Sequence, residues 1–234
     1  MITAIVPARS GSKRLPGKNI KLLNGRPLVF HTIDAVLDHK MISKVVFTTD
    51  SDEYIDLVLE EYGDLITIEK RPEHFASDTT KVHDEIIRLA DTNVIQTQWF
   101  MLCLPTAPMR DHKSVERFLE AWSIDNCARF SASVYDFPIQ FAFDIVSDGD
   151  WKALSQESPM ITGNTRSQDI PKRYHPNGAI YLQKTDSLHT NKIFYIDAKP
   201  FLLSPYESVD VDNEIDFKFA ELLIGKKEHG KLIS

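Results

Sequence analysis

Short β-branched apolar runs alternate with stretches of helical spacing through the first half of the chain, and this order constrains the fold most. The strand-like runs are "ITAIVPA" from Ile2, "KVVFTTD" from Lys44, "LITIE" from Leu65 and "WFMLCL" from Trp99. Continuous apolar runs of this kind are typical of strands that are buried on both faces. The helical stretches between them predict right-handed βαβ crossovers. The expected class is therefore α/β, with a Rossmann-like, mostly parallel sheet and helices on both faces.

Residues 80–92 show the helical spacing most clearly. Three apolar positions fall on one face of a helix there: Val82, Ile86 and Leu89. A stripe of this kind is typical of an amphipathic crossover helix. Asp84 and Arg88 are four residues apart on the other side, so they are expected to form an ion pair.

The charge of the chain limits its partners. The 234 residues carry a net charge of −7, with 42% hydrophobic and 26% charged residues, which is ordinary for a compact globular protein. General nucleic-acid or membrane-surface binding needs a broad positive field, so neither partner is expected. Cys103 and Cys127 lack the CxxC spacing of a redox or zinc site and are interpreted as reduced thiols. Without a leader or an apolar run of membrane-spanning length, the chain is predicted to be cytoplasmic.

The regular alternation stops after residue 136. Residues 137–174 contain aromatic side chains, prolines and a polar turn but no long period of either kind. Such a stretch is too long for a plain loop in a compact domain. We interpret it as an excursion, within a single domain of residues 1–234, that packs on a subdomain or on a second subunit. The strand-like "NGAIYLQK" from Asn177 then returns to the sheet, and an acidic turn and a helix through Phe217 close the chain.

A basic, glycine-containing loop follows the first predicted strand. The stretch "PARSGSKRLPGKN", residues 7–19, contains two glycines and four cationic side chains, and Lys21 comes just after it. Loops at the carboxyl ends of parallel strands form the binding edge of such a sheet. Glycine and serine let backbone N–H groups face an anion, and arginine and lysine add charge-assisted contacts. We therefore expect the loop to bind a polyphosphate, although it is neither a Walker A nor a GxGxxG loop. A solvated surface loop is the alternative.

A second constellation is "VDVD", residues 209–212. Period-two spacing places Asp210 and Asp212 on the same side of an extended segment. Two such carboxylates repel each other unless a cation lies between them, and Mg²⁺ would neutralise both and reach phosphate oxygens. The alternative is an exposed acidic turn in which Asp212 or Asn213 caps the final helix.

Five motifs occur in order along nearly the whole chain: "PARSGSKRLPGKN", "RPEHFASDTT", "LPTAPMR", "HPNGAIYL" and "SVDVDNEIDF". Together they resemble the cytidylyltransferases that activate nonulosonic acids, the family of the CMP-N-acetylneuraminate (sialic acid) synthetases. The resemblance implies a fold of the nucleotide-diphospho-sugar transferase type. It also implies transfer of CMP from CTP to the anomeric hydroxyl of a nine-carbon 2-keto sugar acid, with release of pyrophosphate, for glycan or surface polysaccharide synthesis. Mg²⁺ and a homodimer, with the 137–174 excursion as the dimerisation element, are implied as well.

The same resemblance implies roles for individual residues. The positions that match nucleotide contacts are Arg9, Ser12, Lys18, Asn19 and Arg71, and those that match metal carboxylates are Asp210 and Asp212. In the implied reaction Lys18, Arg9 and the metal meet the charge that builds up on the leaving pyrophosphate. No side chain in the motifs identifies itself as a general base.

Acceptor recognition is where the sequence departs from the sialic acid enzymes. Leu104 stands where they carry a glutamine, and the basic residue before "PNGAIY" is changed to His175. The leucine favours a deoxy acceptor such as legionaminic or pseudaminic acid, unless it only packs at the strand end. Arg166 and Arg173 are candidates to bind the sugar carboxylate, which a guanidinium binds with two hydrogen bonds. Tyr181 is either a sugar contact or a core residue.

Two rival functions stay open. CMP-Kdo synthetases share "RLPGK" but lack the "SDTT", "PNGAIY" and "VDVD" set that this chain carries. A nucleotide-binding module without turnover is the other rival, and the intact Lys18, Asp210 and Asp212 argue against it.

Overall fold

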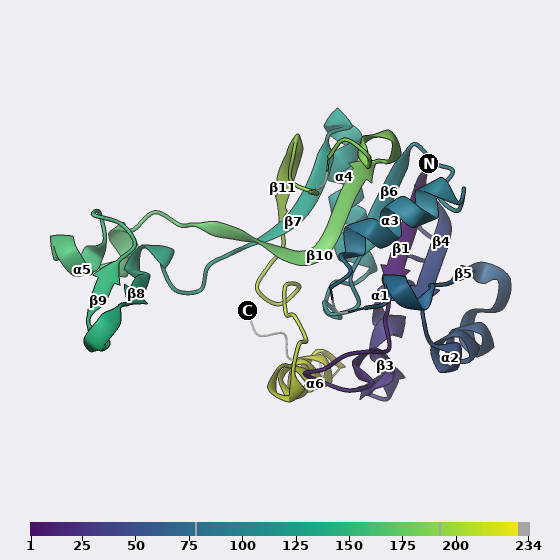
Figure 1. Ribbon diagram of the computed structural model, residues 1–234, viewed down its shortest axis with the longest axis horizontal. Helices are drawn as coiled ribbons and strands as arrows, with labels where there is room; N and C mark the ends of the chain where they lie inside the picture. The colour runs from purple at the N-terminus through teal and green to yellow at the C-terminus, as the bar shows by residue number, and fades with distance from the viewer. Residues whose placement is uncertain (78, 192, 229–234) are drawn as a thin grey trace.

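A seven-stranded sheet forms the centre of the computed structural model, which describes residues 1–77, 79–191 and 193–228 (Figure 1). The strand order is β11-β7-β10-β6-β1-β4-β5. The strands are β1 (Ile2–Pro7), β4 (Ile42–Thr49), β5 (Thr67–Lys70), β6 (Trp99–Cys103), β7 (Ala128–Val134), β10 (Tyr174–Lys184) and β11 (Ala198–Leu202). Strands β6, β1, β4 and β5 are parallel, as are β11 and β7, while β10 is antiparallel to both of its neighbours. The predicted, mostly parallel sheet is confirmed.

Helices cover both faces of this sheet. The α-helices of the described residues are α1 (Leu28–Val36), α2 (Asp52–Tyr62), α3 (Val82–Asp91), α4 (His112–Asp125), α5 (Pro159–Thr162) and α6 (Glu214–Glu228). Alternate strand residues point to opposite faces. In β1, Ala4 and Val6 pack in the core that α1, α2 and α4 cover, whereas Ile5 packs on the other side with Ile86 and Leu89 of α3.

The ion pair predicted within α3 is wrong. Arg88 donates from Nε to Oε2 of Glu85 at 2.8 Å, three residues earlier rather than four. Asp84 instead accepts the backbone N–H of Lys81 at 3.1 Å in the first turn. The short aspartate side chain at a helix start satisfies a free backbone donor, and this leaves the longer Glu85 to reach Arg88.

A third, smaller core joins the two ends of the chain. Its buried members are Leu15, Leu23, Leu28, Met109, Val211, Phe217 and Ala220. Leu15 belongs to the basic loop, Val211 to the "VDVD" segment and Phe217 to α6. Burying these apolar side chains together is favourable, because it removes their surface from water. The basic loop and the two aspartates are therefore held at the same edge of the molecule.

Residues 135–173 form an arm that projects away from the sheet from the ends of β7 and β10 (Figure 1). The arm contains the antiparallel pair β8 (Phe143–Ile145) and β9 (Trp151–Ala153) as well as α5.

A further two-stranded sheet, β2 (Leu22–Leu23) with β3 (Arg26–Pro27), follows the basic loop. Single-turn 3₁₀ helices are η1 (Lys18–Ile20), η2 (Gly63–Leu65), η3 (Glu73–Phe75), η4 (Ile139–Phe141), η5 (Ser147–Gly149), η6 (Ser167–Asp169) and η7 (Thr185–Ser187). No helix in the described parts of the chain is both long and apolar enough to cross a membrane.

Candidate active site

The basic loop leaves the carboxyl end of β1 and is fixed by hydrogen bonds at both of its ends. Ser10 donates its backbone N–H and its hydroxyl to the two carboxylate oxygens of Asp50, at 2.8 Å and 2.6 Å. The buried Asn19 donates from Nδ2 to the carbonyl oxygen of Arg9 at 3.0 Å. Gly17 turns the chain into η1 with a φ of 65°, a conformation that favours glycine. The loop is therefore a shaped segment, which disfavours the alternative of a plain solvated loop.

Asp50 lies at the end of β4, beside β1, and was not singled out in the sequence. Burial acts to raise the pKa of its carboxyl, but the hydrogen bonds from Ser10 and the charge of Arg71 outweigh burial, and the pKa is lowered. Asp50 is therefore a fixed anion that orders the loop. The signal that could have identified it is its place after "KVVFTT", at the carboxyl end of a buried strand.

A cavity of about 450 Å³ opens over the loop. Its lining comes from two segments: Arg9, Ser10, Gly11, Ser12, Lys13 and Pro16 of the loop, and Ala76 and Ser77 after η3. The predicted nucleotide residues Arg9 and Ser12 thus face a cavity. Asp78, which belongs to the second motif, lies outside the described residues.

Lys18 connects the loop to the "VDVD" segment. It is 8% exposed, and its Nζ donates to the carbonyl oxygen of Val211 at 2.8 Å and to Oδ1 of Asp212 at 3.2 Å. Arg14 donates to the other oxygen of Asp212 at 2.6 Å. The basic loop and the carboxylate pair, which the sequence predicted separately, are thus in direct contact although they lie almost 200 residues apart. Arg14 was missed as an individual residue, although the density of cations in the loop includes it.

The side chains of Asp210 and Asp212 lie within electrostatic reach of each other and do not cap α6, although the backbone N–H of Asp212 donates to the Asp216 carboxylate at 2.9 Å. Asn213 makes that cap: its Oδ1 accepts from the backbone N–H groups of Ile215 and Asp216, and the Asp216 carboxylate accepts from the N–H of Asn213 in return. Of the two capping residues that the sequence suggested, Asn213 is confirmed. Neither carboxylate of the pair is therefore used to cap the helix: that of Asp212 accepts from Lys18 and Arg14, and that of Asp210 contacts Thr106.

The electrostatics of the pair favour a cation. Although Asp210 keeps an exposed surface, the protein atoms around it partly desolvate its carboxylate and raise its pKa; the negative charge of Asp212 adds to this, whereas the hydroxyl of Thr106 and the charge of Lys18 oppose it. Within the described residues no group of three or more histidine, cysteine, aspartate or glutamate side chains could hold a metal ion. Two carboxylates in contact with the basic loop nevertheless suit Mg²⁺, which is usually bound by one or two carboxylates together with substrate phosphates.

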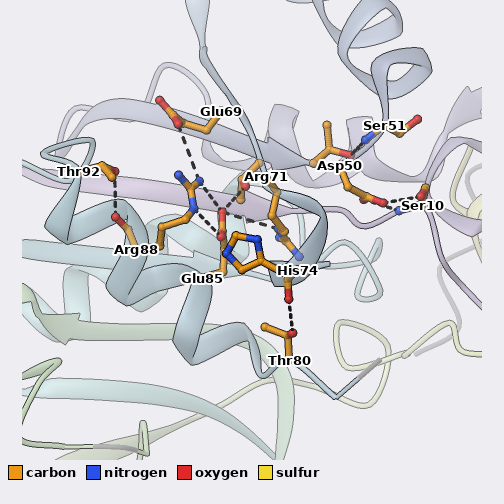
Figure 2. A network of polar contacts seen from close by, with 12 residues as sticks. Ser10, Asp50, Ser51, Glu69, Arg71, His74, Thr80, Glu85, Arg88 and Thr92 are labelled. Carbon is orange, nitrogen blue, oxygen red and sulfur yellow. Dashed lines mark hydrogen bonds and ion pairs between the residues drawn. The ribbon is translucent and has the colours of Figure 1, made fainter. Parts of the chain in front are cut away.

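Arg71 lies after β5, at the centre of a polar network (Figure 2). Its backbone N–H donates to the carbonyl oxygen of Thr49 at 2.7 Å, and its side chain is buried, with 6% of the residue exposed. The guanidinium Nε is 3.7 Å from Oε1 of Glu85, and among the described residues neither Nε nor Nη2 has a hydrogen-bond partner. The backbone bond to Thr49 places Arg71 beside Asp50, which in turn holds Ser10 of the cavity lining.

Glu85 is the buried anion of this network, and the sequence analysis missed it. The residue lies on α3 and is completely buried. A glutamate next to the apolar stripe of a crossover helix is the signal that could have identified it, because a carboxylate is rarely buried without partners.

The candidate sugar residues divide into two groups. Leu104 follows β6, is half-buried, and packs in the same core cluster as Tyr181 of β10. The Tyr181 hydroxyl is 3.3 Å from that of Tyr195, and burial, together with this bond and the charge of Asp210, raises the pKa of Tyr181. Leu104 and Tyr181 thus lie together on one side of the "VDVD" segment.

Arg166 and Arg173 belong to the arm instead. Both are exposed, and Arg166 is 3.6 Å from the carboxylate of Asp169. The arm that carries both arginines projects away from the sheet, whereas Leu104 follows β6 and Tyr181 lies on β10 within the sheet (Figure 1). Their role in binding a sugar carboxylate stays a prediction.

Comparison with known proteins places these features in a family. The cytidylyltransferase family matches residues 3–207. A CMP-N,N'-diacetyllegionaminic acid synthase of Legionella pneumophila is 32% identical over 237 residues, which cover 95% of this chain and 96% of that protein. A pseudaminic acid cytidylyltransferase of Campylobacter jejuni is 30% identical over 226 residues, with 94% of each chain covered. An N-acylneuraminate cytidylyltransferase of Escherichia coli is 32% identical over 99% of this chain, which spans 54% of that longer protein.

A solved structure confirms the fold. The CMP:2-keto-3-deoxy-manno-octonic acid synthetase complexed with CTP matches with a TM-score of 0.67 at 16% identity, over 97% of this chain and 99% of that chain. At this identity the likeness shows the architecture alone. The family match and the relatives above 30% identity go further: this chain belongs to the cytidylyltransferase family.

Proposed function

We propose that this chain transfers CMP from CTP to the anomeric hydroxyl of a nonulosonic acid and releases pyrophosphate. The observation that carries the proposal is the contact of Lys18 with Asp212, which joins the basic loop, whose earlier residues line the cavity, to the pair of carboxylates. The names of three relatives, which concern legionaminic, pseudaminic and N-acylneuraminic acids, support the acceptor class.

The basic loop binds the triphosphate in this proposal. Arg9 and Ser12 line the cavity, and Lys18, at the end of the same loop, is fixed by two oxygen acceptors. Attack of the acceptor hydroxyl oxygen on the α-phosphorus forms the new P–O bond and breaks the bond to the β-phosphate oxygen. Negative charge then builds up on pyrophosphate. Cations that are already in place stabilise that charge without reorganisation, and this is how Lys18 and Arg9 lower the barrier.

Asp210 and Asp212 are the residues that would hold Mg²⁺, which when bound neutralises both carboxylates and polarises phosphate oxygens. Asp212 also accepts from Lys18 and Arg14. The same carboxylate therefore holds two cations of the basic loop. No described side chain among the motifs is assigned as general base.

Arg71 reads the base in this proposal. A guanidinium only donates hydrogen bonds, and the buried Nε and Nη2 of Arg71 have no hydrogen-bond partner among the residues that the structure describes. Cytosine presents two neighbouring acceptors, O2 and N3, whereas uracil carries an N–H at N3. Arg71 is thus suited to cytosine and would be left facing a donor by uracil. Leaving a buried donor unpaired is costly, which gives selectivity.

The acceptor binds beside Leu104 and Tyr181. An apolar side chain at position 104 favours deoxy acceptors of the legionaminic or pseudaminic type over N-acetylneuraminate, because it offers no hydrogen bond to a hydroxyl. Gly178 lies against Leu104, since a Cβ at Gly178 would stand 3.7 Å from Cδ1 of Leu104. The leucine is therefore held in place rather than loose at the strand end.

A homodimer is part of the proposal. The arm exposes large apolar side chains, including Phe137 at 67%, Phe143 at 47% and Trp151 at 49%, while Phe141 is half-buried against Phe137. An apolar surface of this kind on a projecting element fits burial against a second copy. The same arrangement would allow Arg166 and Arg173 to approach the acceptor site of the partner. A cytoplasmic location, where CTP is made, is also part of the proposal.

The direct test is release of pyrophosphate from CTP and Mg²⁺ with separate nonulosonic acids. N-Acetylneuraminate, a legionaminic acid and a pseudaminic acid are the test acceptors, and Kdo is the control. Formation of the CMP-sugar with at least one nine-carbon acceptor is expected. Turnover with Kdo alone, or with none of the acceptors, would reject the proposal.

A further inference from the structure

Glu85 of α3 carries a carboxylate that is completely buried and almost completely satisfied. Oε2 accepts from Nε of Arg88 at 2.8 Å, and Oε1 accepts from Nη2 of Arg88 at 2.9 Å. The hydroxyl of Thr48, on β4, donates to Oε1 as well. Figure 2 shows Glu85 between Arg88 and Arg71. One carboxylate thus already has a complete partner in Arg88 before Arg71 is considered.

Arg71 is attracted to Glu85 without a hydrogen bond. The distance of 3.7 Å between Arg71 Nε and Glu85 Oε1 is too long for one, and in the described part of the chain Nη2 also lacks a hydrogen-bond partner. Burial lowers the pKa of Arg71, while the charge of Glu85, and then that of Asp50, opposes this; Arg88 and Arg9 add to the lowering. Glu85 is therefore the main opposite charge that makes a buried, charged Arg71 tolerable.

Around Arg71 the source of the opposite charge does not also occupy the hydrogen-bond donors, although one carboxylate usually does both. In a close arginine–carboxylate pair the fork of donors is consumed by the partner. Here the fork of Arg88 is consumed and that of Arg71 is not, although both guanidinium groups neighbour the same carboxylate. A guanidinium that is held by charge alone keeps its donors for a ligand.

We propose that Glu85 is a positioning residue for base recognition, holding Arg71 beside the nucleotide cavity by charge while leaving its fork of donors for cytosine. The inference rests on the proposed function in one respect, the assignment of Arg71 to the base. It predicts that Glu85 acts only through Arg71. Removing the charge of Glu85 should therefore change the selectivity of nucleotide binding, which precedes the chemical step.

The test measures binding of CTP and UTP by calorimetry, with no acceptor present. Glu85→Gln keeps the shape of the side chain and can still accept from Thr48, but removes the charge. The expected result is about tenfold weaker binding of CTP, the size of a lost charge-assisted contact, with little change for UTP. The ratio of the two affinities therefore falls.

Glu69→Gln is the matched control. Glu69 also faces Arg88, at 3.8 Å, so the same chemical change removes a carboxylate from the same network without touching Arg71. This variant should keep the affinity for CTP and the preference over UTP. Glu85→Asp retains the charge on a shorter side chain and should keep more of the preference than Glu85→Gln. It also serves as the second variant if Glu85→Gln fails to fold.

A double substitution decides whether Glu85 works through Arg71. In an Arg71→Met background, Glu85→Gln should cost no further CTP affinity. Additive losses, or an unchanged CTP-to-UTP ratio in folded Glu85→Gln, would overturn the inference, as would equal losses in the Glu69→Gln control. If the wild-type chain binds CTP selectively but transfers CMP to no acceptor, the proposed function fails while the role of Glu85 stands.

Discussion

Asp210 and Asp212 are expected to be equally necessary for turnover but to have opposite effects on the stability of the metal-free protein. Asp210→Asn removes a charge that the fold disfavours, since partial desolvation by the protein atoms around it and the charge of Asp212 raise the pKa of Asp210. The asparagine can still hydrogen-bond with Thr106. Because Asp210 is solvent-exposed, the gain in free energy of unfolding should be below about 1 kcal/mol, which raises Tm by at most about 2–4 °C in a chain of this length.

Asp212→Asn has the reverse effect, because it removes the charge partner of Lys18 and Arg14. The pair with Arg14, whose side chain is 69% exposed, is worth little, whereas the Lys18 side chain is only 10% exposed and loses a charged acceptor at 3.2 Å. The expected loss is about 2 kcal/mol, or about 4–8 °C in Tm. Thermal unfolding in EDTA measures both changes, and pyrophosphate release with Mg²⁺ measures turnover, which both variants should lose.

The pH dependence gives an internal check with a definite sign. A carboxyl whose folded pKa is raised favours the folded state while it is protonated, and that contribution is lost as pH rises through the carboxyl range. The advantage of Asp210→Asn should therefore be present near pH 7 and shrink as pH falls toward about 4, close to the usual aspartate pKa. Equal Tm losses in both variants would refute the opposite electrostatic roles of the two carboxylates. Turnover within about threefold of wild type would refute their description as metal carboxylates.

The remaining predictions concern selectivity and assembly. Leu104→Gln should raise kcat/KM for N-acetylneuraminate relative to a deoxy nonulosonic acid by a ratio worth about 1–2 kcal/mol, one good hydrogen bond; an unmoved ratio would show that Leu104 only packs. CTP should be strongly preferred to ATP, GTP and UTP in pyrophosphate release, and equal rates with ATP would contradict a cytidylyltransferase. Sedimentation at micromolar concentration should give twice the 26.7 kDa mass of one chain, and Phe143→Ser with Trp151→Ser in the arm should shift it toward the monomer. A monomeric wild-type protein would remove the proposed role of the arm.

Local patterns determined much of this protein. The alternation of apolar runs with helical spacing specified the parallel strands β1, β4, β5 and β6, because burial on both faces leaves a continuous apolar run in the sequence itself. The basic loop and "VDVD" were likewise visible in the sequence. Glycines and cations close together after a strand are typical of anion binding, and two aspartates two residues apart are typical of cation binding. Family motifs then gave the nucleotide residues Arg9, Ser12 and Arg71 their expected roles.

Contacts between distant segments were decided only by the tertiary structure. The sequence predicted a phosphate loop and a carboxylate pair but not that Lys18 bridges them, because no periodic pattern encodes a contact across 194 residues. Glu85 and Asp50 were overlooked for the same reason: their importance comes from burial and from which cations the fold brings near. Even within α3, Arg88 pairs with Glu85 and not with Asp84. The reason lies at the helix start, where the Asp84 carboxylate accepts the backbone N–H of Lys81. Residue identity fixes which charges a chain carries, but desolvation and distance, which set their energies, arise only when the chain is folded.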